Sequence, residues 1–154
     1  MSYKELVESL EIAKNKQYYL IKGETPEKVI IEVERLLGFR LSKQHKHFLS
    51  KVGYLSFSGY EFFGICDYKL QGKDVLCAVE TTLKERKKYK LPEQWVLFCS
   101  FDDGYMGYLD YSKLNQDGEP ALIMAFYNGK KQAYVKKISD DIGSYIIKCL
   151  EYSK

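Results

Sequence analysis

Arginine, histidine and closely spaced cysteines are scarce in this 154-residue chain, and each shortage argues against a class of function. Only three of the 24 cationic residues are arginine, namely Arg35, Arg40 and Arg86. Nucleic-acid and phosphate sites favour the forked guanidinium of arginine, so the composition disfavours direct nucleic-acid binding. The two histidines, His45 and His47, would point about 200° apart on a helix. They could not share a metal ion, and we expect no metal site.

Nucleotide and nucleophile motifs are missing as well. Cys66, Cys77, Cys99 and Cys149 lack C-x-x-C spacing, and we expect free thiols that are mostly buried as small hydrophobic residues. The glycines form neither G-x-G-x-x-G nor G-x-x-x-x-G-K, which argues against a nucleotide cradle. No serine lies in a G-x-S-x-G setting, and no cysteine has a usefully placed histidine. We therefore expect no catalytic residues, no cofactor and no enzyme activity.

Long hydrophobic runs are also absent. The chain has no stretch of 18 apolar residues, and its first 14 residues contain no apolar core of a signal peptide. We therefore expect a cytoplasmic protein without a membrane partner. With 45% hydrophobic and 29% charged residues, the chain can bury about two thirds of its unfolded surface. We expect residues 1–154 to form a single domain with a mild net charge of +3.

Apolar residues that recur every three or four positions predict helices. The first helix begins near Tyr3 and fades at residues 15–17, before a connector that runs to residue 24. Thr25 is the predicted N-cap of a second helix, which should stop at Gly38. Ser42 is the predicted N-cap of a third helix. Further helices are predicted over residues 74–88 and from residues 139–141 onward.

An apolar period of two predicts short strands between these helices. The predicted strands cover residues 54–58, 60–65, 95–101, 105–111, 121–127 and 132–138. Turns are predicted at Asp102-Asp103-Gly104 and at Asn128-Gly129, where a type I′ turn would need positive φ at both central residues. The expected fold class is α+β, with helices packed against a mostly antiparallel sheet.

Three features leave functional alternatives open. Asp102 and Asp103 could serve a hydrolase, but only in a cleft with strongly perturbed titration. The basic run from Lys84 to Lys90 is typical of a solvated helix end, and salt-dependent RNA binding would be the signature of the alternative. The 14 tyrosines include several near predicted turns, where exposed rings suit protein interfaces.

The order of the motifs resembles the SUKH superfamily, which includes the fungal cell-wall-synthesis regulator and many small bacterial immunity proteins. In the first half, the resemblance rests on Pro26-Glu27, the segment from Leu37 to Ser42, Phe48-Leu49, Val52-Gly53 and Phe63-Gly64-Ile65. In the second half, it rests on Leu91-Pro92, Trp95 to Phe98, Asp102 to Gly104, Tyr108-Leu109-Asp110 and Asp117 to Ala121. It spans residues 25–150 and leaves residues 1–24 as a less diagnostic N-terminal helix and connector. Ser42 departs from the proline that the family often has there.

This resemblance implies a bacterial immunity protein (an antitoxin) that binds and neutralises the toxic domain of a cognate polymorphic secreted toxin, with nucleases among the candidate toxins. The alternative is a housekeeping protein–protein interaction module of the same fold. Because the net charge is positive, an acidic partner face must be local. From turn placement and residue type we expect this face to contain Tyr60, Glu61, Asp67, Tyr68, Asp102, Asp103 and Tyr105. The same tyrosine-rich surface would also suit a homodimer.

Overall fold

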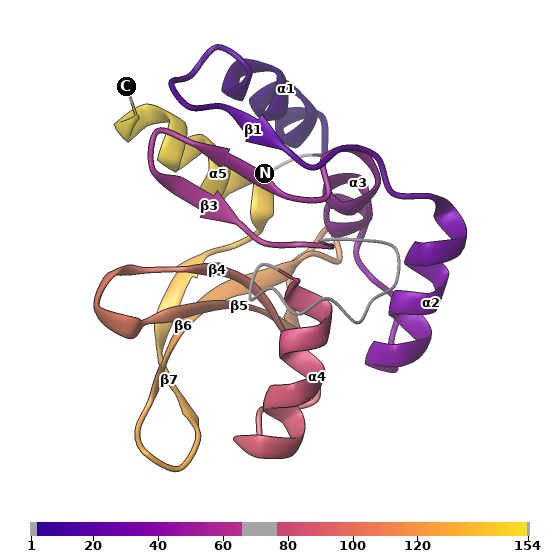
Figure 1. Ribbon diagram of the computed structural model, residues 1–154, viewed down its shortest axis with the longest axis vertical. Coiled ribbons are helices and arrows are strands. Elements are labelled where there is room, and N and C mark those ends of the chain that lie inside the picture. Colours follow the sequence, from indigo (N-terminus) through magenta and orange to yellow (C-terminus); the bar gives the residue numbers. More distant parts are fainter. Residues whose placement is uncertain (1–2, 66–76, 154) are drawn as a thin grey trace.

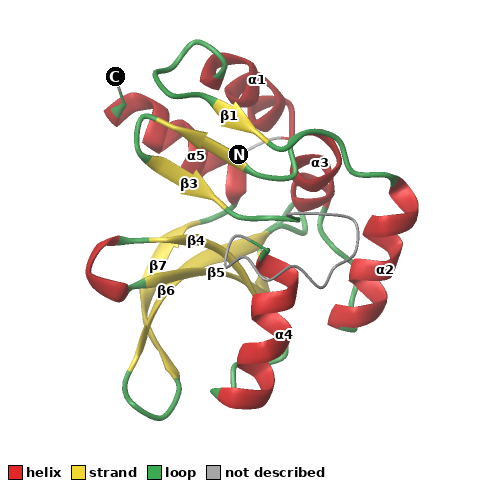
Figure 2. Ribbon diagram, in the orientation of Figure 1, coloured by secondary structure: helices red, strands yellow, loops and turns green. Residues whose placement is uncertain are grey.

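The computed structural model describes residues 3–65 and 77–153, and these form five α-helices and a seven-stranded antiparallel sheet (Figures 1 and 2). The helices are α1 (Tyr3–Ala13), α2 (Glu27–Leu37), α3 (Lys43–Lys51), α4 (Ala78–Lys88) and α5 (Ile142–Tyr152). The strands are β1 (Leu20–Ile21), β2 (Leu55–Phe57), β3 (Tyr60–Phe62), β4 (Trp95–Ser100), β5 (Met106–Leu114), β6 (Pro120–Tyr127) and β7 (Gln132–Ser139). They lie side by side in chain order. The predicted α+β class is confirmed.

The sheet is covered on both faces. In β4, Val96 and Phe98 belong to the larger hydrophobic core, which also contains residues of α1, α3 and α5. The alternate residues Trp95 and Leu97 belong to a second core, which contains Ala78 of α4. This alternation is the period of two expected of a strand that is buried on both faces. In Figure 2, α1 and α5 accordingly lie above the central strands and α4 below them.

The helix ends test the capping predictions. Gly38 adopts a φ of 92° after α2, and the Ser42 hydroxyl accepts the His45 N–H at 3.2 Å, as predicted. The prediction for Thr25 is wrong, because Pro26 is the N-cap of α2. The Thr25 N–H donates to the Ser50 carbonyl at 3.0 Å, which holds this residue in the connector before the helix.

Other boundaries shift by a few residues. β7 extends to Ser139, and α5 begins at Ile142, where the Asp141 carboxylate accepts the Ser144 N–H at 2.8 Å. α4 begins at Ala78, and residues 74–76 of the predicted helix lie outside the described residues. Helices as short as the 11 residues of α1 fall well below the roughly 20 that span a bilayer. No helix within residues 3–65 or 77–153 is long and apolar enough to cross a membrane.

Of the two predicted turns, the one between β4 and β5 has the type I′ geometry that the sequence predicts for the one between β6 and β7. Asp103 and Gly104 both have positive φ, 62° and 83°, which is the requirement of a type I′ turn. At the β6–β7 turn, Gly129 has positive φ but Asn128 does not, so the predicted type I′ turn is wrong there. The Asn128 side chain instead accepts the backbone N–H groups of the two lysines that follow Gly129, and this bonding fixes a different turn.

Three of the cysteines can be placed in this fold. Cys77, Cys99 and Cys149 are free and buried, which confirms the expectation for these three. Cys66 lies outside the described residues.

Candidate functional site

A groove of about 820 Å³ opens where four distant segments meet. Its walls come from the β2–β3 hairpin, the start of the β4–β5 turn, one side of α5 together with Ser153, and the residues just before β1. Figure 1 shows the β2–β3 turn beside the C-terminal end of α5, with the β4–β5 turn below them. The groove therefore depends on tertiary packing of the whole sheet edge and not on one local motif.

Aromatic side chains form the floor and one wall of the groove. Phe62 is fully buried, and the Tyr145 ring meets it edge to face at a centroid distance of 5.8 Å. Tyr145 also meets Phe101 edge to face, at 6.0 Å. Burial raises the pKa of the Tyr145 and Tyr60 hydroxyls, so both remain protonated near neutral pH and can donate hydrogen bonds.

Two rim residues keep most of their surface in solvent. Tyr18 is 84% exposed and Tyr152 is 72% exposed, and both line the groove. A tyrosine that is exposed in the free protein can bury a large rigid ring against a partner while its hydroxyl finds a new bond. The two rings are thus suited to contact with another molecule.

The charged residues of the groove have one sign. Among the described residues that line it, only Glu61 and Asp102 carry charge, although the chain as a whole is cationic. The Glu61 carboxylate accepts the Tyr54 hydroxyl proton at 2.6 Å, which holds it in one orientation. Such a surface complements a basic patch on a partner.

Residues with an unfavourable positive φ are concentrated in and beside the groove. Among the described residues, four that are not glycine have positive φ, and Tyr18 (59°) and Ser58 (48°) line the groove while Asp103 (62°) adjoins Asp102. Positive φ is unfavourable for a bulky tyrosine, and strained residues concentrate at functional sites. The Ser58 N–H donates to the Gln17 carbonyl at 2.7 Å, which ties two walls of the groove together. The rim is therefore preorganised.

The predicted partner residues are only partly brought together. Tyr60, Glu61 and Asp102 line the groove. Asp103 lies exposed in the adjoining turn. Tyr105 ends that turn and packs its ring on Phe126, with centroids 4.8 Å apart. Predicted members Asp67 and Tyr68 lie outside the described residues.

Sequence reasoning missed several groove residues because they come from the two ends of the chain. Tyr18 lies in the connector before β1, and Tyr152 follows the apolar stripe of α5; neither residue has a distinguishing sequence pattern. The position of Tyr145 in the apolar stripe of α5 indicates only that it faces the sheet. Nothing local in the sequence reveals that these residues face the β2–β3 turn.

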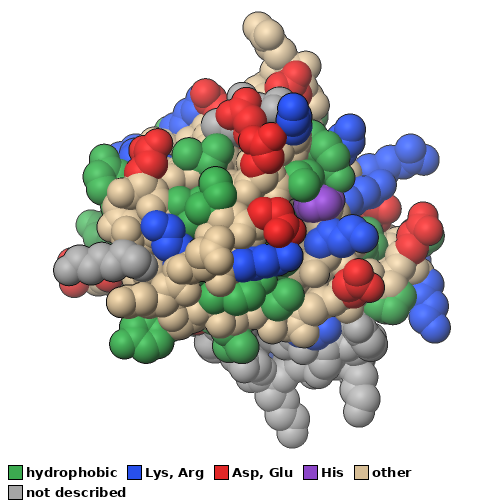
Figure 3. Space-filling view, turned by 90° about the horizontal axis from the view of Figure 1, so that it is seen from above, with side chains coloured by type: hydrophobic (Ala, Val, Ile, Leu, Met, Phe, Trp, Pro, Cys, Tyr) green, Lys and Arg blue, Asp and Glu red, His purple; other side chains and the backbone are tan. Residues whose placement is uncertain are grey.

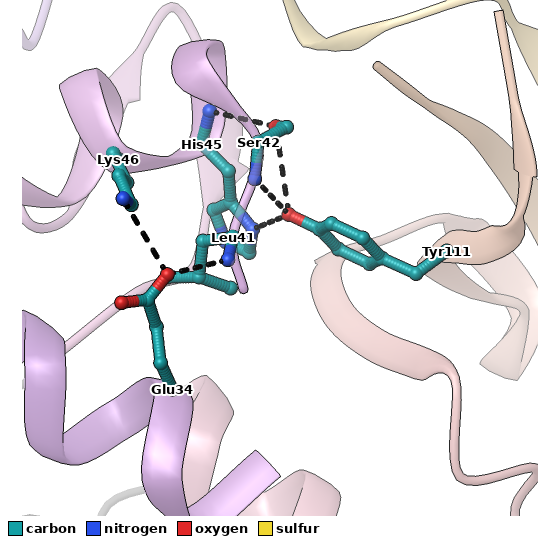
Figure 4. Close-up of polar contacts among 6 residues, drawn as sticks. All are labelled: Glu34, Leu41, Ser42, His45, Lys46 and Tyr111. Atoms are coloured by element: carbon teal, nitrogen blue, oxygen red, sulfur yellow. Dashed lines mark hydrogen bonds and ion pairs between the residues drawn. The ribbon is translucent and has the colours of Figure 1, made fainter. Parts of the chain in front are cut away.

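A separate polar cluster joins α2, α3 and β5 and serves the fold (Figure 4). The Tyr111 hydroxyl accepts the Ser42 N–H at 3.0 Å and lies 2.7 Å from His45 Nδ1. Burial lowers the pKa of His45 to about 3, so the ring is neutral and shares a hydrogen bond with this hydroxyl through Nδ1. Glu34 accepts the Leu41 N–H at 2.7 Å in the same cluster.

The second histidine and the smaller hollows lie around α1 and α3. His47 Nδ1 lies 2.8 Å from the Tyr3 hydroxyl, so the two histidines have separate partners. A hollow of about 420 Å³ beside His47 is lined by both lysines and glutamates, including the ion pair of Lys46 and Glu34 at 3.5 Å. Figure 3 shows acidic and basic side chains mixed across the face seen from above. A surface of mixed charge favours neither a cationic nor an anionic partner, whereas the charged residues described in the groove are both acidic.

Comparison with known proteins places this architecture in a family. No curated protein matches the chain. The model of the family SUKH_6, described as SMI1-KNR4 cell-wall, matches residues 27–146. The match includes the groove residues from the β2–β3 turn to Tyr145 in α5. The rim residues Tyr18 and Tyr152 lie outside it. Since the match spans most of the chain, this protein belongs to the SUKH_6 family within the SUKH superfamily.

Proposed function

We propose that this protein is a bacterial immunity protein, which binds the toxic domain of a cognate polymorphic toxin and blocks its activity. The groove is the observation that supports this function most directly. It combines a preorganised backbone, exposed tyrosines and a local negative charge, which are the properties of a protein-binding face. Membership of a superfamily that contains many immunity proteins supports the same conclusion.

The proposed mechanism is steric and electrostatic. Tyr18 and Tyr152 flank the groove and would bury their rings against the toxin. Glu61 and Asp102 would face cationic side chains there, as in the nucleic-acid-binding cleft of a nuclease. Covering such a cleft excludes its substrate without any chemistry by the immunity protein. The proposal therefore assigns no catalytic residue and no cofactor.

Coexpression tests the proposal. The chain is produced together with the C-terminal domain of a large secreted protein encoded beside its gene, and host survival and copurification are measured. Rescue with a stable complex is the expected result. If both proteins are folded but neither rescue nor binding occurs, the immunity function is refuted and a housekeeping interaction module becomes the better interpretation.

A triple variant then tests the groove itself. Changing Tyr60→Ala, Glu61→Gln and Asp102→Asn should weaken toxin binding at least about 30-fold, equivalent to about 2 kcal/mol. The reason is that the three changes remove side chains that the proposed complex would bury as anchors. The matched control changes the same residue types on other exposed surfaces, at Tyr134, Glu93 and Asp117. The control should bind within twofold of the wild type. Equal affinities for the two triple variants would show that the toxin binds elsewhere.

A further inference from the structure

The basic run at the end of α4 does not stand alone in the structure. The Tyr89 ring contacts the Tyr127 ring at a centroid distance of 4.7 Å, which joins the end of α4 to the end of β6. At the start of β7, the Gln132 amide donates a hydrogen bond to the Glu85 carboxylate of α4 at 3.4 Å. In Figure 1 the C-terminal end of α4 and the β6–β7 turn both lie at the bottom of the molecule. This contact places the lysine-bearing end of α4 beside the end of β6, which leads into the turn that carries Lys130 and Lys131.

We call this surface the lysine–tyrosine patch; it consists of Lys87, Lys88, Tyr89, Lys90, Tyr127, Lys130 and Lys131. All five lysines are exposed. Within the described parts of the chain, none of the five forms an ion pair. Lysines on either side of the patch differ, since Lys84 pairs with Glu80 at 2.9 Å and Lys137 pairs with Asp140. Among the described residues, the patch is therefore a local concentration of lysines that have no ion-pair partner.

The carboxylate closest to the patch in the sequence is turned into the fold. Glu85 is buried between α4 and the sheet, where it accepts the Tyr108 hydroxyl proton at 2.7 Å. Burial raises the pKa of Glu85 above its ordinary value. The Arg86 guanidinium, the only arginine nearby in the chain, donates to the Glu93 carbonyl and is engaged within the fold.

The two tyrosines add flat surfaces between the charges. Tyr127 is 39% exposed, Tyr89 is partly exposed, and their rings are tilted by 51° and not stacked face to face. Lys88 Nζ lies 5.3 Å from the Tyr89 ring centre. Lys90 has positive φ (54°) immediately after Tyr89, where the helix ends. Aromatic rings among lysines are the arrangement by which proteins bind single strands, since bases stack on the rings and phosphates contact the cations.

We propose that the lysine–tyrosine patch binds single-stranded nucleic acid without sequence preference, with phosphates at the five lysines and a base on Tyr127. A helix dipole accounts for the lysines at the end of α4 but not for Lys130 and Lys131, which belong to a turn between strands. An acidic protein is the weaker candidate, because protein interfaces are depleted in lysine and enriched in arginine. Lysine is a point charge that suits phosphate contacts without base readout. None of the patch residues lines the groove, so this activity is independent of toxin binding.

Fluorescence anisotropy with a fluorescein-labelled 12-nucleotide oligouridine RNA tests the proposal on the full chain. Five phosphate contacts predict that affinity falls about 100-fold between 50 and 200 mM salt. The double variant Lys88→Gln with Lys131→Gln should bind at least about fivefold more weakly at 50 mM salt, and its log–log salt slope should be smaller by about 1.4. The charge-matched control, Lys4→Gln with Lys28→Gln, alters exposed lysines of α1 and α2 and should leave affinity within twofold.

The tyrosine separates nucleic acid from a generic polyanion. Tyr127→Ala should weaken RNA binding about fivefold or more, whereas Tyr127→Phe, which keeps the ring, should bind as the wild type does. An oligoglutamate peptide of equal charge should compete poorly. Absence of salt-dependent RNA binding overturns the proposal, as does equal weakening by the two lysine double variants. Equal competition by oligoglutamate together with full affinity of Tyr127→Ala would assign the patch to acidic proteins and overturn it as well.

Discussion

Replacing Tyr111 with phenylalanine should destabilise the protein by about 2–4 kcal/mol, because one hydroxyl serves two buried groups. Its oxygen accepts the Ser42 N–H, and the same hydroxyl shares a hydrogen bond with Nδ1 of the neutral His45 ring. Each buried polar group left without a partner costs about 1–3 kcal/mol, so the two together give about 2–6 kcal/mol. Ser42 retains slight solvent access, which places the expected value in the lower half of that range.

Urea unfolding of the wild type and the Tyr111→Phe variant measures this loss directly. For a chain of this length, about 2–4 kcal/mol corresponds to a fall in Tm of about 4–16 °C, which a thermal melt would show independently. Tyr134→Phe is the matched control because this tyrosine is 51% exposed, and the change should alter stability by less than about 0.5 kcal/mol. A loss for Tyr111→Phe no greater than that of the control would refute the assignment of both hydrogen bonds.

Three further predictions concern the core. Gly64→Ala should cost far more stability than Gly38→Ala. A Cβ at residue 64 would lie 1.9 Å from the Gly53 carbonyl oxygen, whereas a Cβ at residue 38 meets open space and costs only about 1–2 kcal/mol through the positive φ. The urea midpoints of the two variants measure this difference. Burial raises the pKa of Glu85 above 4.5, so the folded state binds its proton more tightly and the stability from this group is lost as pH rises through the raised pKa. Glu85→Gln should flatten that fall in unfolding free energy measured from pH 4.5 to 8, and an unchanged slope would assign it to another group. The buried Cys99 thiol has a raised pKa and should resist alkylation by iodoacetamide until urea unfolds the chain, so rapid labelling of this residue in the native protein would contradict its burial.

The parts of the fold that sequence predicted well are those decided within a few residues. Ser42 caps α3 because its hydroxyl reaches an N–H three positions along the chain, and Gly38 ends α2 because it tolerates positive φ. Thr25 failed as a cap because the chain becomes helical one residue later than expected: Pro26 is still extended, with a φ of −61° and a ψ of 149°, while Thr25 lies in the connector and donates its N–H to the Ser50 carbonyl. Local capping rules contain no information about such a bond.

The candidate site shows the same division. Tyr60, Glu61 and Asp102 adjoin turns, and the structure brings them together along the groove; their contact with a partner stays a prediction. Tyr105 adjoins the same turn, but its ring packs on Phe126 of β6, and the direction of that ring depends on strand pairing that no local pattern encodes. Tyr152 belongs to the groove only because α5 packs back across the sheet.

The groove is assembled from residues as far apart in the chain as Gln17 and Ser153. A partner that binds there recognises a surface that no fragment or half-folded intermediate possesses. Occupancy would then protect distant segments together: a partner at 100 times its Kd would add about 2.7 kcal/mol to global stability and slow proteolysis of sites far from the interface. Only the completely folded protein can therefore bind at the groove. A substitution that loosens α1, the β2–β3 hairpin or α5 lowers the concentration of binding-competent protein even when it changes no residue that contacts the partner.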